Sequence, residues 1–276
     1  MNKRIKEIMR DFIPPLFLKM YLNITTKYGF FANYSNWEEA KKASTGYDSD
    51  LILNKVSDSL LKIKAHEAVY ERDSILFDKI EYSWPLLTGL MWIAANEDGK
   101  LNLIDFGGSL GSSYYQNRLF LQTLKEVKWN IVEQKHFVEC GKKYFEDDTL
   151  KFYKSIEECL RTQTPSTMIL SGVIQYIEKP YELIDYIIKK NFKYLIFDRT
   201  TFNKRNVDKL VVQKINPTIF SASYPCWFLN KNKFAQMFDN KYVLINEFKS
   251  FENSEDRNSP LFNGFIFILK QVYKEG

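Results

Sequence analysis

The sequence of 276 residues has little of what metal sites and disulfides need. It contains three cysteines, Cys140, Cys159 and Cys226, which form no C-x-x-C pair, and two histidines, His66 and His136. An odd number of widely spaced cysteines predicts neither a disulfide framework nor a zinc site, so we expect no metal. Free thiols are typical of a reducing compartment, and the cytoplasm is therefore the expected location.

Long apolar runs and clusters of basic residues are also missing. The apolar stretch at residues 12–22 is broken by Pro14 and Pro15, and it falls far short of the roughly 20 apolar residues that a membrane span requires. The formal net charge of +5 is spread along the chain, so no run of Lys and Arg follows a phosphate backbone. Nucleic acid is therefore not a predicted partner.

The N-terminal segment leaves two interpretations open. Residues 1–22 alternate basic and apolar side chains, which fits peripheral association with the inner face of a membrane. The same pattern fits packing against the segment's own domain or against a second subunit, so the oligomeric state also stays open. The overall composition, with 45% hydrophobic residues, is that of a soluble globular protein with one large core or two modest ones.

The most informative local pattern lies at residues 101–118, which read LNLIDFGGSLGSSYYQNR. An apolar-rich run at 101–104 predicts a strand, the glycines predict a tight loop, and the following segment predicts a helix capped by Ser112 or Ser113. The N–H groups at the start of such a helix suit the polar end of a nucleotide-like cofactor. An ordinary strand-to-helix turn is the alternative.

Two glycine patterns can be compared with this loop. The dinucleotide pattern G-x-G-x-x-G, counted from Gly107, fails at its third and sixth places. The pattern acidic-x-Gly-x-x-x-Gly matches with Asp105, Gly107 and Gly111. The segment therefore resembles motif I of the S-adenosylmethionine-dependent methyltransferases, with Ser109 where that motif usually has its middle glycine.

The order of predicted elements changes near residue 97. Before it, a capped turn at 36–46, an amphipathic pattern at 53–63 and a helix that begins at Pro85 predict a helical region. After it, strands alternate with helices, and the predicted strands are 101–105, 129–133, 150–153, 167–171 and 194–198. Such alternation predicts a parallel sheet with helices on both faces.

The C-terminal part predicts a different connection. Two strand-like runs, 242–248 and 262–269, are separated by a polar stretch too short for a crossover helix, so they should pair antiparallel. A parallel sheet closed by such a hairpin is the class I methyltransferase (Rossmann-like) arrangement of the α/β class. We expect a helical lid or substrate region at 1–96 and the Rossmann-like domain at 97–276.

The carboxyl ends of the predicted strands collect polar residues at one edge of the sheet, where ligands bind in open α/β folds. Glu133 ends the second strand, and its carboxylate is expected to accept both ribose hydroxyls of an adenosine; a solvated Glu beside Lys135 is the alternative. The full set of predicted cofactor-binding residues is Asp105, Gly107, Gly108, Ser109, Gly111, Glu133, Ser155 and Ser171.

A longer resemblance covers nearly the whole chain. Segments such as EAVYERDS at 67–74, YSWPLL at 82–87, IDFGGSLGSSYYQNR at 104–118 and SGVIQYIEKPYELI at 171–184 resemble a methyltransferase family found in bacterial surface-polysaccharide (O-antigen and capsule) gene clusters. This resemblance implies S-adenosylmethionine as cofactor and O-methylation of a sugar or glycan precursor. A methyltransferase-shaped protein that binds a ligand or an assembly partner without catalysis is the second hypothesis.

The implied reaction needs alignment of acceptor and methyl group, and a base if the acceptor is a hydroxyl. His136, three residues past Glu133, is the first candidate base, although it could instead hydrogen-bond the backbone or stack near adenine. Tyr176, after the fourth strand, is the second candidate. The residues expected around a sugar or phosphate ligand are Tyr47, Arg72, Trp84, Gln175, Arg199 and Trp227.

Overall fold

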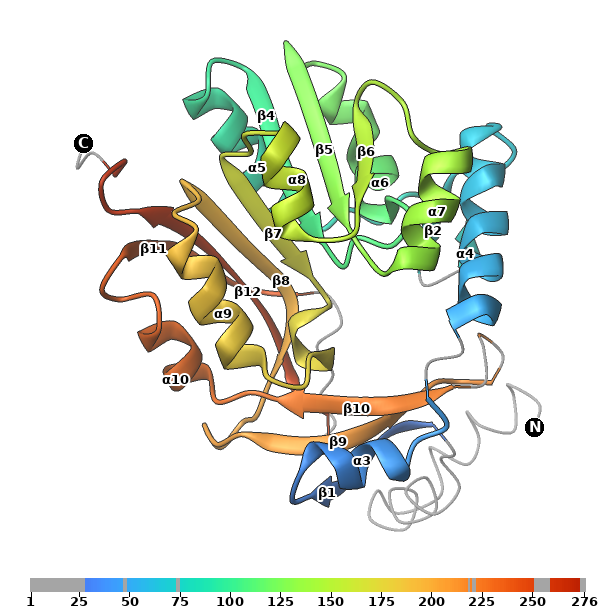
Figure 1. Cartoon of the computed structure of the whole chain (residues 1–276), viewed down its shortest axis with the longest axis vertical. Coiled ribbons are helices and arrows are strands. Elements are labelled where there is room, and N and C mark those ends of the chain that lie inside the picture. Colours follow the sequence, from blue (N-terminus) through green and yellow to red (C-terminus); the bar gives the residue numbers. More distant parts are fainter. Residues whose placement is uncertain are drawn as a thin grey trace, which may run out of the picture.

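A seven-stranded sheet forms the centre of the molecule, with the order β11-β12-β8-β7-β4-β5-β6 (Figure 1). The computed structural model describes residues 28–46, 49–72, 75–217, 219, 222–250 and 259–273, without the side chains of residues 49–51 and 72. The strands are β4 (Lys100–Phe106), β5 (Glu126–Val132), β6 (Leu150–Tyr153), β7 (Thr167–Ser171), β8 (Tyr194–Phe202), β11 (Tyr242–Lys249) and β12 (Leu261–Leu269).

The directions of these strands confirm the predicted fold class. Strands β4 to β8 pair parallel, as the alternation of strands and helices predicts. Strand β12 pairs antiparallel with β8, and β11 pairs antiparallel with β12. The sheet is therefore a class I methyltransferase sheet closed by a C-terminal hairpin.

Helices cover both faces of this sheet and enclose two apolar cores. On one face, α4 (Ser49–Lys64), α5 (Trp84–Asn96), α6 (Ser112–Leu121) and α7 (Lys135–Tyr144) contribute to a core around Trp129. On the other face, α8 (Ile156–Thr162), α9 (Pro180–Lys189) and α10 (Lys231–Gln236) pack over a core around Phe197. Helix α5 is in the first core with strands β4 and β8, so this part of residues 1–96 packs directly on the sheet.

The predicted N-terminal helices are present, but residues 1–96 are not wholly helical. The turn after Asn36 forms α3 (Trp37–Lys42), and the amphipathic pattern forms α4. Three strands that the sequence did not predict are interspersed: β1 (Gly29–Tyr34), and the hairpin of β2 (Tyr70–Arg72) and β3 (Ile75–Phe77). Residues 1–22, including the segment considered for membrane association, lie outside the described residues.

A second, three-stranded sheet was also not predicted. Strand β1 pairs with β9 (Lys209–Lys214), which pairs with β10 (Ser223–Phe228), and Figure 1 shows this sheet beyond the carboxyl ends of β7 and β8. The turn η1 (Ile174–Tyr176) holds it in place, because the Tyr176 hydroxyl donates to Gln213 Oε1 at 2.7 Å. Trp227, on β10, makes a second hydrogen bond, in which its Nε1 donates to the Glu178 carbonyl at 3.2 Å. The second sheet therefore covers one side of the edge where ligands bind in this fold.

Strand β8 carries a bulge at the same edge. Phe197 pairs with Phe265 and Thr200 with Asn263, so Asp198 and Arg199 together face the single residue Gly264. A Cβ atom at position 264 would lie 2.1 Å from Phe248 Cζ and 2.8 Å from the Phe197 carbonyl oxygen. The bulge thus requires glycine on the neighbouring strand, because any side chain would overlap its surroundings.

We expect Gly264→Ala to lower the free energy of unfolding by about 1–3 kcal/mol, as overpacking of a filled site does. Urea denaturation of the variant and the wild type measures the change. Because the closest contact is the Phe248 ring, the same substitution should cost less in a Phe248→Ala background, and an unchanged cost would contradict the proposed clash.

Candidate functional site

Asp105 is a buried carboxylate near the end of the central strand β4. It is 1% exposed, and its Oδ2 accepts a hydrogen bond from Trp129 Nε1 at 2.9 Å. A Cβ atom at position 108 would lie 2.5 Å from the same oxygen. The loop backbone therefore passes directly over the carboxylate, and only glycine fits at position 108.

The loop backbone takes left-handed conformations at three positions. Gly107 has φ +70° and Gly111 has φ +101°, and between them Ser109 has φ +55°. Ser109 thus adopts the backbone conformation that favours glycine, at the place where motif I usually has its middle glycine. This geometry agrees with the resemblance although the residue differs.

The predicted cap of helix α6 was wrong. The N-cap is Gly111, with no side-chain hydrogen bond to the first turn, and Ser112 is already helical. The Ser112 hydroxyl instead donates to the Glu71 carboxylate, which strand β2 brings to this point and which is buried. The first N–H groups of α6 therefore have no side-chain cap and remain suited to an anionic group.

Glu133 lies directly after strand β5, close enough to Asp105 for its charge to act on that carboxyl group. Burial raises the pKa of Asp105 to about 7; the hydrogen bond from Trp129 lowers it, and the negative charge of Glu133 raises it. Burial also raises the pKa of Glu133, whose carboxylate accepts from the Gln134 N–H at 2.8 Å. Two adjacent, partly desolvated carboxylates favour a ligand that brings positive charge or hydroxyl donors.

His136 lies in the first turn of α7, close in sequence to Glu133. Its Nε2 is enclosed and has no hydrogen-bond partner. Its ring packs against Phe137, with centroids 5.0 Å apart. An acceptor could reach Nε2 only after the imidazole rotates. This geometry therefore fits stacking of His136 near adenine as well as it fits a role as the base.

A polar cluster lies at the same edge, at the end of β7, in η1 and on the bulge within β8. Asp198 is buried, which raises its pKa, and it accepts from the Ser171 hydroxyl at 3.1 Å and the Ser250 hydroxyl at 3.3 Å. Gln175 is also buried; its Nε2 donates to the Arg199 carbonyl at 3.1 Å, and its Oε1 has no partner. The structure thus brings Ser171, Gln175 and Arg199 together.

Arg199 lies on the bulge with φ +53°, a left-handed conformation that costs energy for a residue with a side chain. Its side chain lies beside Gly172, since a Cβ atom there would be 3.7 Å from Arg199 Cζ. A guanidinium at this edge can bind a carboxylate or phosphate oxygen of a ligand.

Other predicted site residues have structural partners. Ser155 caps α8, because its hydroxyl accepts from the Glu158 N–H at 3.1 Å. Tyr176 and Trp227 hold the second sheet, as described above. Trp84 is 59% exposed and packs near Tyr82, with ring centroids 5.1 Å apart, rather than with the strand-end cluster. Tyr47 and the Arg72 side chain lie outside the described residues.

Three residues of this edge were missed by sequence reasoning. Trp129 holds Asp105, Glu71 holds Ser112, and Ser250 contributes to the Asp198 network. Each contact joins residues at least 24 positions apart, and no local pattern marks such a pair.

Within the described ranges, no three His, Cys, Asp or Glu side chains gather as metal ligands would. In the same part of the chain, no helix has the length and apolar character of a membrane span.

Comparisons with known proteins return solved structures only; no family model and no curated protein matches the chain. The N-terminal domain of EvdMO1, in the presence of SAH and D-fucose, is 10% identical over 81% of this chain and 98% of that chain, with a TM-score of 0.48. The glycopeptide N-methyltransferase MtfA, complexed with sinefungin, is 8% identical over 66% of this chain and 93% of that chain, with a TM-score of 0.44.

A third similar structure is the PH0226 protein from Pyrococcus horikoshii OT3, 11% identical over 70% of this chain and 94% of that chain, with a TM-score of 0.44. The fold assignment depends on the order and direction of the strands in the chain itself.

The buried carboxylate gives a prediction for stability against pH. The pKa of Asp105 in the folded chain, about 7, lies above its ordinary value of 3.8, so its contribution to stability is complete below about pH 4 and is lost as the pH rises through 7. Asp105→Asn keeps an oxygen acceptor for Trp129 and removes this titration. Between pH 5 and 8, the free energy of unfolding should fall by about 2–3 kcal/mol more in the wild type than in the variant. Urea denaturation at both pH values measures this difference, and parallel behaviour of the two proteins would contradict the assignment.

Proposed function

We propose that the chain is an S-adenosylmethionine-dependent methyltransferase that methylates an oxygen of a sugar or glycan precursor. The observation that carries the proposal is the pair of carboxylates, Asp105 and Glu133, beside a glycine loop at the carboxyl edge of a class I methyltransferase sheet. The sheet, the glycine loop and the acidic pair are all features of this chain.

The residues present fit this cofactor. Gly107 and Gly108 let the loop backbone pass against Val173 and Asp105, and the uncapped first turn of α6 would offer N–H groups to the cofactor's carboxylate. Glu133 would accept the ribose hydroxyls, and the acidic pair favours a cofactor with positive charge. When bound, S-adenosylmethionine supplies a methyl group already activated on a sulfonium centre.

The chain's own residues would then align the acceptor. Gln175 lies in η1, after β7, and Arg199 lies on the bulge within β8, at the edge where an acceptor would lie in this fold. Ser171 is joined to them through Asp198. The second sheet lies beyond this edge (Figure 1), and exclusion of water there would strengthen each polar contact within the site. Positioning of this kind contributes up to roughly 7–11 kcal/mol to a two-reactant step.

A base for a hydroxyl acceptor is the least complete part of the site. His136 stays the first candidate, but its Nε2 must rotate outward to receive a proton. The Tyr176 hydroxyl already donates to Gln213 and would have to leave that bond. These two geometries support a second candidate function, a methyltransferase-fold protein that binds a ligand or an assembly partner without transfer.

The cellular setting is part of the proposal. The resemblance to the surface-polysaccharide family and the three free cysteines support a bacterial cytoplasmic enzyme that acts on a glycan precursor.

Isothermal titration with S-adenosylmethionine, S-adenosylhomocysteine and NAD separates the two candidate functions. Binding of the first two with mass-spectrometric detection of a methyl increment on glycan precursors would support transfer. Binding without any methylated product would favour the second candidate, and preference for NAD would overturn both.

Glu133→Ala is expected to weaken S-adenosylhomocysteine binding by at least tenfold, because it removes charge-assisted hydrogen bonds worth about 1.5–3 kcal/mol each. Isothermal titration measures the affinity. Glu139→Ala is the matched control, since Glu139 is an exposed carboxylate on α7 that pairs with Lys135 at 3.8 Å. Normal cofactor binding by Glu133→Ala would remove the ribose assignment.

His136→Ala is expected to leave cofactor affinity nearly unchanged and to lower turnover by about 10²-fold or more if the imidazole is the base. Turnover and binding are measured on the same preparation. A loss of affinity as large as that of Glu133→Ala would instead place His136 in the adenosine pocket and move the search for a base to Tyr176.

A further inference from the structure

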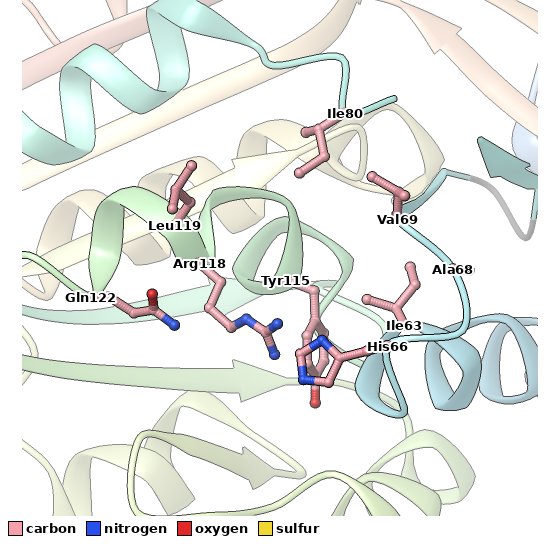
Figure 2. Close-up of a pocket in the computed structure, with 9 residues that line it drawn as sticks. All are labelled: Ile63, His66, Ala68, Val69, Ile80, Tyr115, Arg118, Leu119 and Gln122. Atoms are coloured by element: carbon pink, nitrogen blue, oxygen red, sulfur yellow. The ribbon is translucent and has the colours of Figure 1, made fainter. Parts of the chain in front are cut away.

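A cavity of about 310 Å³ lies between helix α6, the end of α4 and the chain that leads into β2 (Figure 2). One face of α6 contributes residues spaced by three and four positions, as a helix presents them. The lining residues are Ile63, His66, Ala68, Val69, Ile80, Tyr115, Arg118, Leu119 and Gln122. None of the residues of the proposed cofactor and acceptor sites is among them.

Arg118 is the charged group of this cavity, and among the described residues a negative charge that acts on its lining is that of Asp147, on Tyr115. The Arg118 guanidinium is placed near the ring of Tyr115, with Cζ 6.0 Å from its centroid, and it makes no ion pair with any described residue. None of the nine lining residues is acidic. In Figure 2 the Arg118 guanidinium extends toward Tyr115, and the rings of Tyr115 and His66 overlap in this view. His66 has φ +60°, so the backbone that places its ring is held in a left-handed conformation.

Apart from Gln122, the remaining lining residues are apolar. Ile63, Ala68 and Ile80 line the cavity, and its rim carries two exposed apolar side chains, Val69 at 53% and Leu119 at 64%. Exposed apolar side chains around a concave surface are typical of ligand sites. The volume lies at the small end of the roughly 300–1,000 Å³ of known ligand pockets, so a ligand with one ring or a short chain fits.

We propose that this cavity binds a small organic anion, with its carboxylate on Arg118 and its apolar part against Ile63, Val69 and Leu119. Guanidinium binds a carboxylate through two parallel hydrogen bonds, and the aromatic ring beside it limits access of water. Burial, and after it the negative charge of Asp147, raise the pKa of the Tyr115 hydroxyl to about 12, so this group stays a neutral donor at physiological pH. The proposal does not depend on the methyltransferase activity.

The test is isothermal titration of the full chain with phenylacetate as probe, compared with uncharged phenylacetamide and with the cation 2-phenylethylammonium. We expect saturable binding of phenylacetate at one site and at least tenfold weaker binding of the other two. Equal binding of all three compounds, or no binding of phenylacetate, would overturn the proposal.

Variants locate the site. Arg118→Gln should weaken phenylacetate binding by at least tenfold, and Leu119→Glu, on an exposed position that leaves the fold intact, should weaken it as strongly by charge repulsion. Arg161→Gln, an exposed arginine on α8, is the matched control and should bind normally. Saturating S-adenosylhomocysteine should leave the affinity unchanged. Displacement by S-adenosylhomocysteine, or normal binding by both pocket variants, would show that the anion binds elsewhere and would refute the proposal.

Discussion

The constraint on which this molecule depends most is the burial of the Asp105 carboxylate near the end of its central strand. A charge so placed is costly unless it is hydrogen-bonded, and Trp129 Nε1 donates to this carboxylate. The loop that follows must pass within contact distance of the carboxylate, which restricts position 108 to glycine and takes Ser109 into a left-handed conformation. The start of α6, and with it the N–H groups that have no side-chain cap, is positioned by this passage.

The central sheet could be predicted because its information is local. Each parallel strand is a short apolar run followed by a helix, and the final hairpin is marked by a connection too short for a crossover. The second sheet could not be predicted in the same way. Its pairing joins Gly29 to Lys214 and Tyr34 to Leu210, and nothing in either segment alone specifies a partner so far along the chain. Strand β9 has three buried residues in a row, which local periodicity does not distinguish from a helix.

The same distinction holds for the site. Asp105, the glycines and Glu133 could be named because carboxyl ends of parallel strands meet at one edge, so a residue's place in its own strand decides where it lies. Polarity at that edge does not decide what a side chain does. Ser155 lies at the expected position, but its hydroxyl caps helix α8. The Tyr176 hydroxyl hydrogen-bonds to the second sheet, which local sequence patterns do not predict.

Backbone strain connects the two proposed sites. Of the described residues other than glycine, asparagine and aspartate, four have positive φ: Ala32, His66, Ser109 and Arg199. For a residue with a side chain, this conformation is roughly 1–2 kcal/mol less favourable in free energy than it is for glycine. Three of the four lie where a ligand is proposed, namely the glycine loop, the bulge of β8 and the cavity beside α6. At these places the chain keeps a hydroxyl, a guanidinium or an imidazole at the expense of stability, which is the pattern expected when the side chain serves binding and not the fold.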